Sequence, residues 1–179
     1  MTAERLTHVT SRDGTQVAVW QDGSGPPLVA VHGTTADHSR WMHVAPRLAS
    51  NFTLYLMDRR GRGRSGDTAS YSLEREAEDI RAVVRHAGEH ATLLGHSYGA
   101  LCSAEAALEL PQLHRLILYE PPLALGSLIL PQTVRLELER LVSSGDREGA
   151  LLHFFRKVVG VPEAELSSLK AHPVWPARL

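Results

Sequence analysis

Residues 95–99 read Gly-His-Ser-Tyr-Gly, a G-x-S-x-G sequence between a short apolar run and a helical run of small residues. Ala91 to Leu94 has the composition of a strand, and Ala100 to Ala107 that of a helix. A serine on a tight strand-to-helix turn exposes its hydroxyl above the sheet, and the flanking glycines leave room for the turn. The pattern therefore predicts that Ser97 is a nucleophile mounted on an α/β fold.

The length and charge of the chain limit the classes of protein to which it can belong. Its 179 residues suffice for one domain with a buried core, and 19 Lys and Arg against 20 Asp and Glu give a formal net charge of -1. A nearly neutral chain has no global field that attracts nucleic acid or an anionic membrane. The arginine cluster at positions 59, 60, 62 and 64 is by itself weak evidence for nucleic-acid binding.

Cysteine usage and hydropathy limit the compartment and the kind of site. The single cysteine, Cys102, excludes an internal disulfide, and because it lies in an apolar helical run we interpret it as a small buried hydrophobic residue. The first residues carry no secretion signal, and no stretch approaches the roughly 18 apolar residues of a membrane span. We therefore expect a cytoplasmic protein with no metal, no cofactor, no nucleic-acid partner and no membrane contact.

Short apolar runs alternate with longer amphipathic stretches, a pattern typical of β-α units around a mainly parallel sheet. Asp13 and Gly14 suit a hairpin turn, and Ser72 and Gly88 suit the two ends of a helix. No strand-type run follows Pro122, so the remainder is predicted to be helical. The expected strands are 6–11, 15–21, 27–31, 52–57, 91–94 and a buried strand at 113–119.

A catalytic serine needs a base that takes its proton and donors that stabilise the oxyanion formed on the substrate. The turn supplies one donor, the backbone N–H of Tyr98. A second donor is expected from the loop after the third strand, where Thr34 follows His32 and Gly33. Two of the three requirements of acyl transfer, the nucleophile and the oxyanion donors, thus have candidates.

Together these segments resemble the front half of an α/β-hydrolase-fold protein. The matching segments lie within residues 6–122 and are Val31 to Thr34, Asp58 to Ser65, the G-x-S-x-G turn and Tyr119 to Pro122. The resemblance implies an incomplete α/β-hydrolase core at 1–122, with a mainly parallel sheet of about six strands, and a partial helical cap at 123–179. It also implies that the arginine-rich segment is a structural turn near the site entrance.

The resemblance further implies a serine hydrolase that cleaves an ester or related acyl bond in a small-molecule substrate. Serine at position 97 argues against the epoxide hydrolase and haloalkane dehalogenase branches, whose nucleophile is a carboxylate. Thioesterase, C–C bond hydrolase, perhydrolase-like and acyltransferase chemistry remain open. His32, Gly33 and His96 flank the site and are candidates for substrate contact, although such residues usually brace loops in this family.

The acid and the base of the catalytic triad are expected after the serine, on loops that follow later strands. No such strands are found here, and we expect the chain to stop inside the cap, without the last two strands of the fold. One substitute acid is Glu120, at the carboxyl end of the sixth strand. The later histidines, including His172, do not follow a final strand, so the sequence identifies no base.

Three interpretations remain. The first is a serine hydrolase of which this chain is a fragment or the product of an interrupted reading frame. The second is a binding protein without catalytic activity, and the third is one half of a protein that a partner chain completes. Without later strands the sixth strand would be an exposed apolar edge, at which we expect self-association. A serine without its base retains only about 10³ to 10⁴-fold catalysis over water, so we expect little activity from this chain alone.

Overall fold

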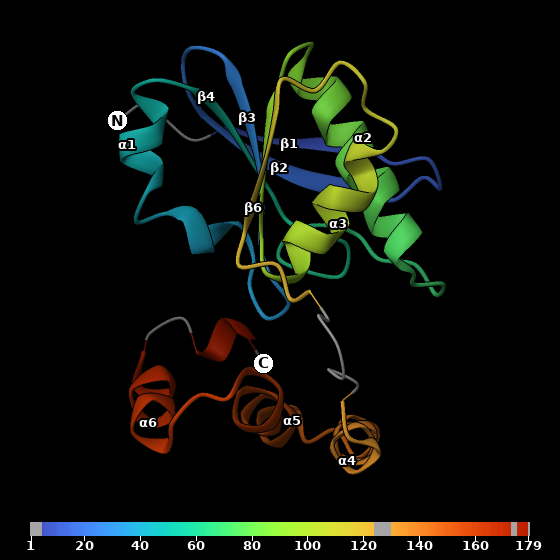
Figure 1. The fold of residues 1–179 in the computed structure, drawn as a ribbon, viewed down its shortest axis with the longest axis vertical. Helices are drawn as coiled ribbons and strands as arrows, with labels where there is room; N and C mark the ends of the chain where they lie inside the picture. The colour runs from blue at the N-terminus through green and yellow to red at the C-terminus, as the bar shows by residue number, and fades with distance from the viewer. Residues whose placement is uncertain (1–4, 124–129, 173–174, 179) are drawn as a thin grey trace. The chain divides into compact units, whose positions relative to one another are not determined.

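The computed structural model describes residues 5–123, 130–172 and 175–178. The chain divides into two compact units, Met1–Leu123 and Ala124–Leu179. In the first unit, six strands form one sheet of order β1-β2-β4-β3-β5-β6 (Figure 1). The strands are β1 (Arg5–Thr10), β2 (Gln16–Gly23), β3 (Pro27–Val31), β4 (Thr53–Met57), β5 (Thr92–His96) and β6 (Arg115–Tyr119). The predicted mainly parallel sheet of about six strands is confirmed.

The register of the parallel strands gathers three loops at one edge of the sheet. Strands β4, β3, β5 and β6 run parallel, whereas β1 and β2 pair antiparallel with their neighbours. Val31, the last residue of β3, pairs with Met57 on β4 and with Gly95 on β5. Because carboxyl ends of parallel strands meet at one edge, the loops after β3, β4 and β5 converge there.

Each central strand is buried on both faces, as its continuous apolar composition predicts. Val29 and Val31 on β3 face a core shared with Ile80, under α2 (Leu73–Ala87) and α3 (Tyr98–Ala107). The alternate residues Leu28 and Ala30 face a second core, which α1 (Ala45–Ala49) and the 3-10 helix η1 (His38–Trp41) cover. The period of two along the strand thus assigns helices to both sides of the sheet.

Local signals mark the helix ends where the sequence predicts them. The Ser72 hydroxyl accepts a hydrogen bond from the Arg75 N–H (3.1 Å), and α2 ends before Gly88, whose φ is 109°. In the second unit the Asp146 carboxylate accepts from the Gly149 N–H (2.8 Å). Capping oxygens of this kind satisfy N–H groups that have no partner inside the helix.

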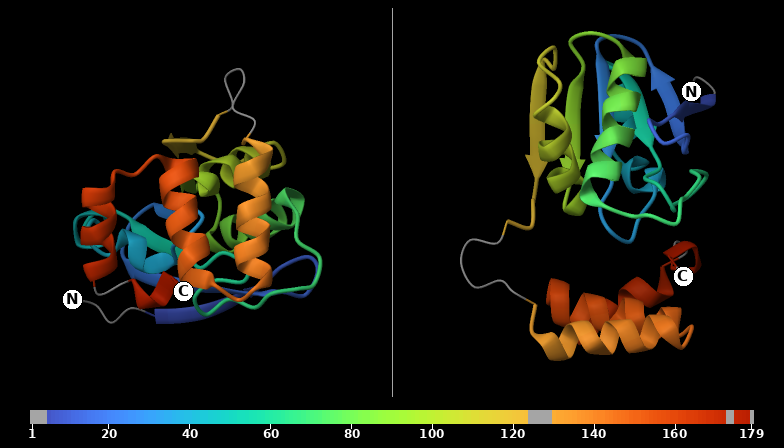
Figure 2. Two further views of the ribbon diagram at one scale, coloured as in Figure 1. Left: turned by 90° about the horizontal axis from the view of Figure 1, so that it is seen from below. Right: turned by 90° about the vertical axis from the view of Figure 1, so that its right-hand side faces the viewer.

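The second unit is helical in its described part and has its own small core. Its elements are α4 (Gln132–Ser143), α5 (Arg147–Phe154), the π-helix η2 (Phe155–Val159), α6 (Glu163–Ala171) and the 3-10 helix η3 (Pro176–Arg178) (Figure 2). Leu151, Phe155, Leu166 and Trp175 are buried against one another. Among the described residues, no helix is long and apolar enough to cross a lipid bilayer.

Strand β6 differs from the buried strand predicted at 113–119. It begins at Arg115, and all five of its residues are exposed; Leu116, Ile117 and Leu118 have relative exposures of 38%, 44% and 38%. The prediction of burial is wrong, because within the described residues β6 pairs on one side alone, with β5. The expected exposed apolar edge is present.

We predict that the chain associates through this edge, because an unpaired apolar strand presents free N–H and C=O groups to a second chain. Sedimentation velocity should detect species larger than a monomer as concentration rises, and Ile117→Lys should reduce them. Leu6→Lys is the matched control, since Leu6 is similarly exposed (37%) on the opposite edge strand. A wild-type chain that remains monomeric at all concentrations would contradict the prediction.

Candidate active site

Ser97 occupies the junction of β5 and α3 in a conformation that residues other than glycine rarely adopt. Its φ is 54° and its ψ is -125°. The Ser97 N–H donates to the Tyr119 carbonyl (2.9 Å), and the Ser97 carbonyl accepts from the Ala100 N–H (2.8 Å). Strained residues of this kind persist where surrounding contacts hold them and are concentrated at functional sites. The half-buried Ser97 is therefore fixed at the edge where the loops converge.

The two glycines of the turn are required by close backbone contacts. A Cβ on Gly99 would lie 2.7 Å from the Val31 carbonyl oxygen, and a Cβ on Gly95 would lie 2.6 Å from the Ala100 Cα. Real Cβ atoms essentially never approach backbone so closely. Glycine at position 99 lets the first turn of α3 pack directly against the end of β3, and glycine at position 95 lets β5 pack directly against α3.

This packing brings the predicted oxyanion loop against the serine. A Cβ on Gly33 would lie 3.1 Å from the Ser97 Cβ and 3.3 Å from the His96 Nδ1. The N–H groups of Thr34 and Tyr98 donate no hydrogen bond to another backbone group among the described residues. Tyr98 begins α3, and the first N–H of a helix has no intrahelical partner. Among the described residues, neither predicted donor is thus taken by a backbone acceptor.

His32 is a buried brace between two loops. Its Nδ1 donates to the Gly33 carbonyl (2.8 Å), since a carbonyl can only accept, and its Nε2 accepts from the Arg59 N–H (3.0 Å). Burial, with a further contribution from the Arg59 charge, lowers the pKa of His32 to about 3. The ring is neutral in one tautomer and inaccessible to solvent.

Asp58 holds the arginine-rich turn as the resemblance implies. Its buried carboxylate accepts hydrogen bonds from the Trp20 Nε1 (3.3 Å), the His38 N–H (2.8 Å) and the Arg64 N–H (2.9 Å). Burial alone would raise the pKa of Asp58, but its hydrogen bonds with the His38 ring and with the N–H groups of Arg64 and His38 lower it. Gly63, with φ of 53°, passes so close to the carboxylate that a Cβ would collide with it.

One group of described residues has the composition of a metal site. Asp37, His38 and Asp58 place one ligand atom each within 4.8 Å of the others. The Asp58 oxygens already accept several protein hydrogen bonds, and the His38 Nδ1 lies 2.8 Å from one of them. Hydrogen bonding therefore explains the cluster without a metal.

Sequence reasoning missed a buried ion pair beside the oxyanion loop. Arg59 is 2% exposed, and its Nε donates to a carboxylate oxygen of Glu76 (3.0 Å), which is fully buried on α2. Burial alone would lower the pKa of Arg59, but the hydrogen bond and charge of Glu76 raise it. The sequence around both residues is typical of exposed positions, because Arg59 lies in a cluster of arginines and Glu76 lies in the first turn of a helix.

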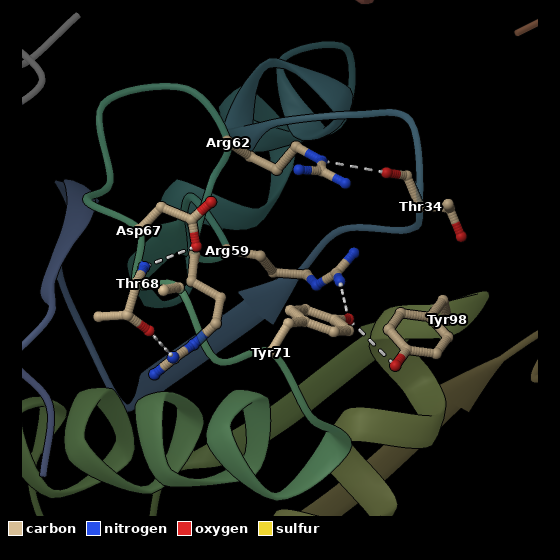
Figure 3. Close-up of a pocket in the computed structure, with 9 residues that line it drawn as sticks. Thr34, Arg59, Arg62, Asp67, Thr68, Tyr71 and Tyr98 are labelled. Atoms are coloured by element: carbon tan, nitrogen blue, oxygen red, sulfur yellow. Dashed lines mark hydrogen bonds between the residues drawn. The ribbon is translucent and has the colours of Figure 1, made fainter. Parts of the chain in front are cut away.

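A cavity of about 530 Å³ opens beside this pair. Thr34, Tyr71 and Tyr98 are among the residues that line it (Figure 3). The hydroxyls of Tyr71 and Tyr98 lie 3.1 Å apart, and the Arg62 Nε donates to the Thr34 carbonyl (3.4 Å). A hollow of molecular size thus adjoins both residues predicted to supply oxyanion donors.

The predicted acid and the flanking histidine meet only loosely. The His96 Nε2 lies 3.9 Å from an oxygen of Glu120, whose side chain is 70% exposed. Burial, together with the charge of Arg40, lowers the pKa of His96. Within the described segments, no histidine forms a hydrogen bond with the Ser97 hydroxyl, so the structure brings Ser97 beside the loop after β3 without placing a histidine on its hydroxyl.

Comparison with known proteins establishes the family. A model of the alpha/beta hydrolase family matches residues 28–179. The chain belongs to this family. A crystal structure of an alpha/beta hydrolase from Sphaerobacter thermophilus superposes with a TM-score of 0.88 at 39% identity, over 96% of this chain and 68% of that one.

Curated relatives match over about half of this chain. The N-formylmaleamate deformylase of Pseudomonas putida is 40% identical over 106 residues, which are 57% of this chain and 40% of that protein. The pimeloyl-[acyl-carrier protein] methyl ester esterase of Edwardsiella ictaluri is 41% identical over 85 residues, 48% of this chain and 32% of that protein. The alignments with these relatives thus span less than half of their length.

The neutrality of His32 predicts a specific pH dependence of stability. Folding lowers the pKa of His32 from 6.5 to about 3. As the pH falls below 6.5, His32 therefore takes up a proton in the unfolded chain but stays neutral in the folded chain. The free energy of unfolding should therefore decrease toward acid by up to about 1.4 kcal/mol per pH unit from this residue.

Urea unfolding of the wild type and of His32→Asn, at several pH values below neutrality, measures this contribution. The variant is expected to be less stable near neutral pH and to show a shallower decline toward acid. Parallel pH profiles for the two proteins would mean that His32 takes up a proton in the folded state.

Proposed function

We propose that the protein is a hydrolase that cleaves an ester or related acyl bond with Ser97 as the nucleophile. The observation that carries the proposal is the positive φ of Ser97 on a turn packed against Gly33, which sets the serine beside the oxyanion loop. The names of the two relatives, a deformylase and a methyl ester esterase, support cleavage of an acyl bond.

In the proposed reaction the Ser97 oxygen attacks the carbonyl carbon of the substrate, and the carbonyl oxygen becomes an oxyanion. The N–H groups of Thr34 and Tyr98 would donate to this oxyanion; a single donor of this kind contributes about 10² to 10³-fold to the rate in serine proteases. Collapse expels the alcohol or amine, and water then releases the acid from the serine ester. The substrate is proposed to be a small molecule that enters the adjoining cavity.

The proposal requires a base and an acid. Glu120 is the acid candidate in this chain, and the base has to come from outside the described residues. In the second candidate function the protein is one half of an active unit. A partner chain that pairs with the exposed β6 would then supply the base. The exposed apolar residues of β6 favour this alternative over a binding protein that keeps the turn as a scaffold.

A fluorophosphonate probe tests the nucleophile, because it reacts with serines beside a formed oxyanion hole. The wild-type chain should be labelled, slowly because no base is in place, and Ser97→Ala should not. Ser70→Ala is the matched control, since Ser70 is exposed on a loop and should leave the labelling unchanged. Mass spectrometry of the intact protein measures the fraction modified.

The outcome distinguishes the candidates. A wild-type chain without labelling would support the scaffold interpretation, and labelling that persists in Ser97→Ala would exclude Ser97 as the reactive group. Labelling that accelerates with the size of the assembly, measured by light scattering on the same samples, would favour completion by a second chain.

A further inference from the structure

The carbonyl group of Gly33 is held by two donors. The Arg59 Nη1 donates to it (3.0 Å), and so does the His32 Nδ1 (2.8 Å). Arg59 is 2% exposed and His32 is fully buried, so water does not compete for either bond. The direction of this carbonyl is therefore set by the protein interior.

The orientation of the Gly33 carbonyl also determines where the Thr34 N–H points. These two groups belong to one planar peptide unit, which is trans here because the described chain has no cis peptide bond. In a trans peptide the C=O and the N–H point in opposite directions. Donors that hold the carbonyl toward Arg59 and His32 thus turn the Thr34 N–H away from them.

Arg59 contacts the second half of the predicted oxyanion hole as well. Its guanidinium lies over the ring of Tyr98, 4.8 Å from the centroid. Two nitrogens of the same group bind both carboxylate oxygens of Glu76 on α2. One buried cation therefore connects the loop after β3 with the first residue of α3, and a carboxylate fixes its plane.

The energetic cost of this pair argues for a role beyond stability. Removing two charges from water is costly, and replacing a buried ion pair by apolar residues of similar volume is often neutral or stabilising. Fixed donors at the Gly33 carbonyl, in contrast, require a group such as a guanidinium, which has several N–H donors in one plane. An apolar replacement would not orient the peptide.

We propose that the Arg59–Glu76 ion pair is a positioning device for the oxyanion hole, acting on Thr34 through the Gly33 carbonyl and on Tyr98 through its ring. The inference rests on the proposed function of Ser97. Arg59 and Glu76 do not touch the reacting atoms; they set the direction of the groups that do. A misplacement of about 1 Å in such a group costs about 100-fold in rate.

Two variants remove the device in different ways. Arg59→Lys keeps the charge but has a single nitrogen, which cannot take the places of Nε, Nη1 and Nη2 at Glu76 and Gly33 at once. Arg59→Met combined with Glu76→Leu removes both charges while filling the volume, so the fold should survive. Arg81→Lys is the matched control, because Arg81 is also buried (4% exposed) and paired with Glu74 and Glu109, and it forms no ion pair with the oxyanion loop within the described residues.

Two readouts are measured on the full chain. The first is the rate of fluorophosphonate labelling of Ser97, expressed per folded molecule. The second is the ¹³C resonance of the Gly33 carbonyl, which reports its hydrogen bonds and does not depend on catalysis. Both Arg59 variants should be labelled about 100-fold more slowly and should shift the carbonyl resonance, whereas Arg81→Lys should change neither.

The inference fails if the folded double variant keeps the labelling rate and the Gly33 resonance of the wild type. It also fails if Arg81→Lys slows labelling as much as Arg59→Lys, since general loss of stability would then explain both. If the wild-type chain is not labelled at all, the proposed function fails, and the carbonyl resonance alone decides whether Arg59 orients the peptide.

Discussion

The close approach of α3 to the end of β3 is the constraint on which the rest of the site depends. Gly99 lies where any Cβ would strike the backbone of Val31 and His32, so the first turn of the helix rests directly on the strand end. This contact sets Ser97 beside Gly33. The parallel register already brings the loops after β3 and β4 to the same edge of the sheet, so further contacts are needed only to fix them there.

Buried polar groups hold those loops, and each is satisfied in a specific protonation state. His32 has to be neutral to donate from one nitrogen and accept with the other, and burial keeps it so. Asp58 has to be charged to accept its donors, and Arg59 needs the carboxylate of Glu76. Networks that are fully paired rigidify a structure, whereas an unpaired member is costly. The loops beside Ser97 are thus held in place without a ligand, as the proposed oxyanion stabilisation would require.

The turn, the strands of the sheet and the helix caps could be predicted because their signals are local. Ser72 begins α2 and Gly88 ends it through a hydrogen bond and a backbone angle that involve only neighbouring residues. The G-x-S-x-G turn likewise contains the glycines that it needs. The ion pair could not be predicted, because Arg59 and Glu76 are 17 residues apart and meet only once α2 lies on the sheet. The apolar composition of β6 predicts a buried strand, and its exposed edge could be expected only because no later strand was found to pair with it.

The proposed function rests on Ser97 as the nucleophile and on the N–H groups of Thr34 and Tyr98 as oxyanion donors. A crystal structure of the chain with a phosphonate on Ser97 tests their geometry most directly. The phosphoryl oxygen should lie about 2.7 to 3.1 Å from the backbone nitrogens of Thr34 and Tyr98. A phosphoryl oxygen directed to solvent, beyond hydrogen-bond distance of both nitrogens, would contradict the assignment of the oxyanion hole.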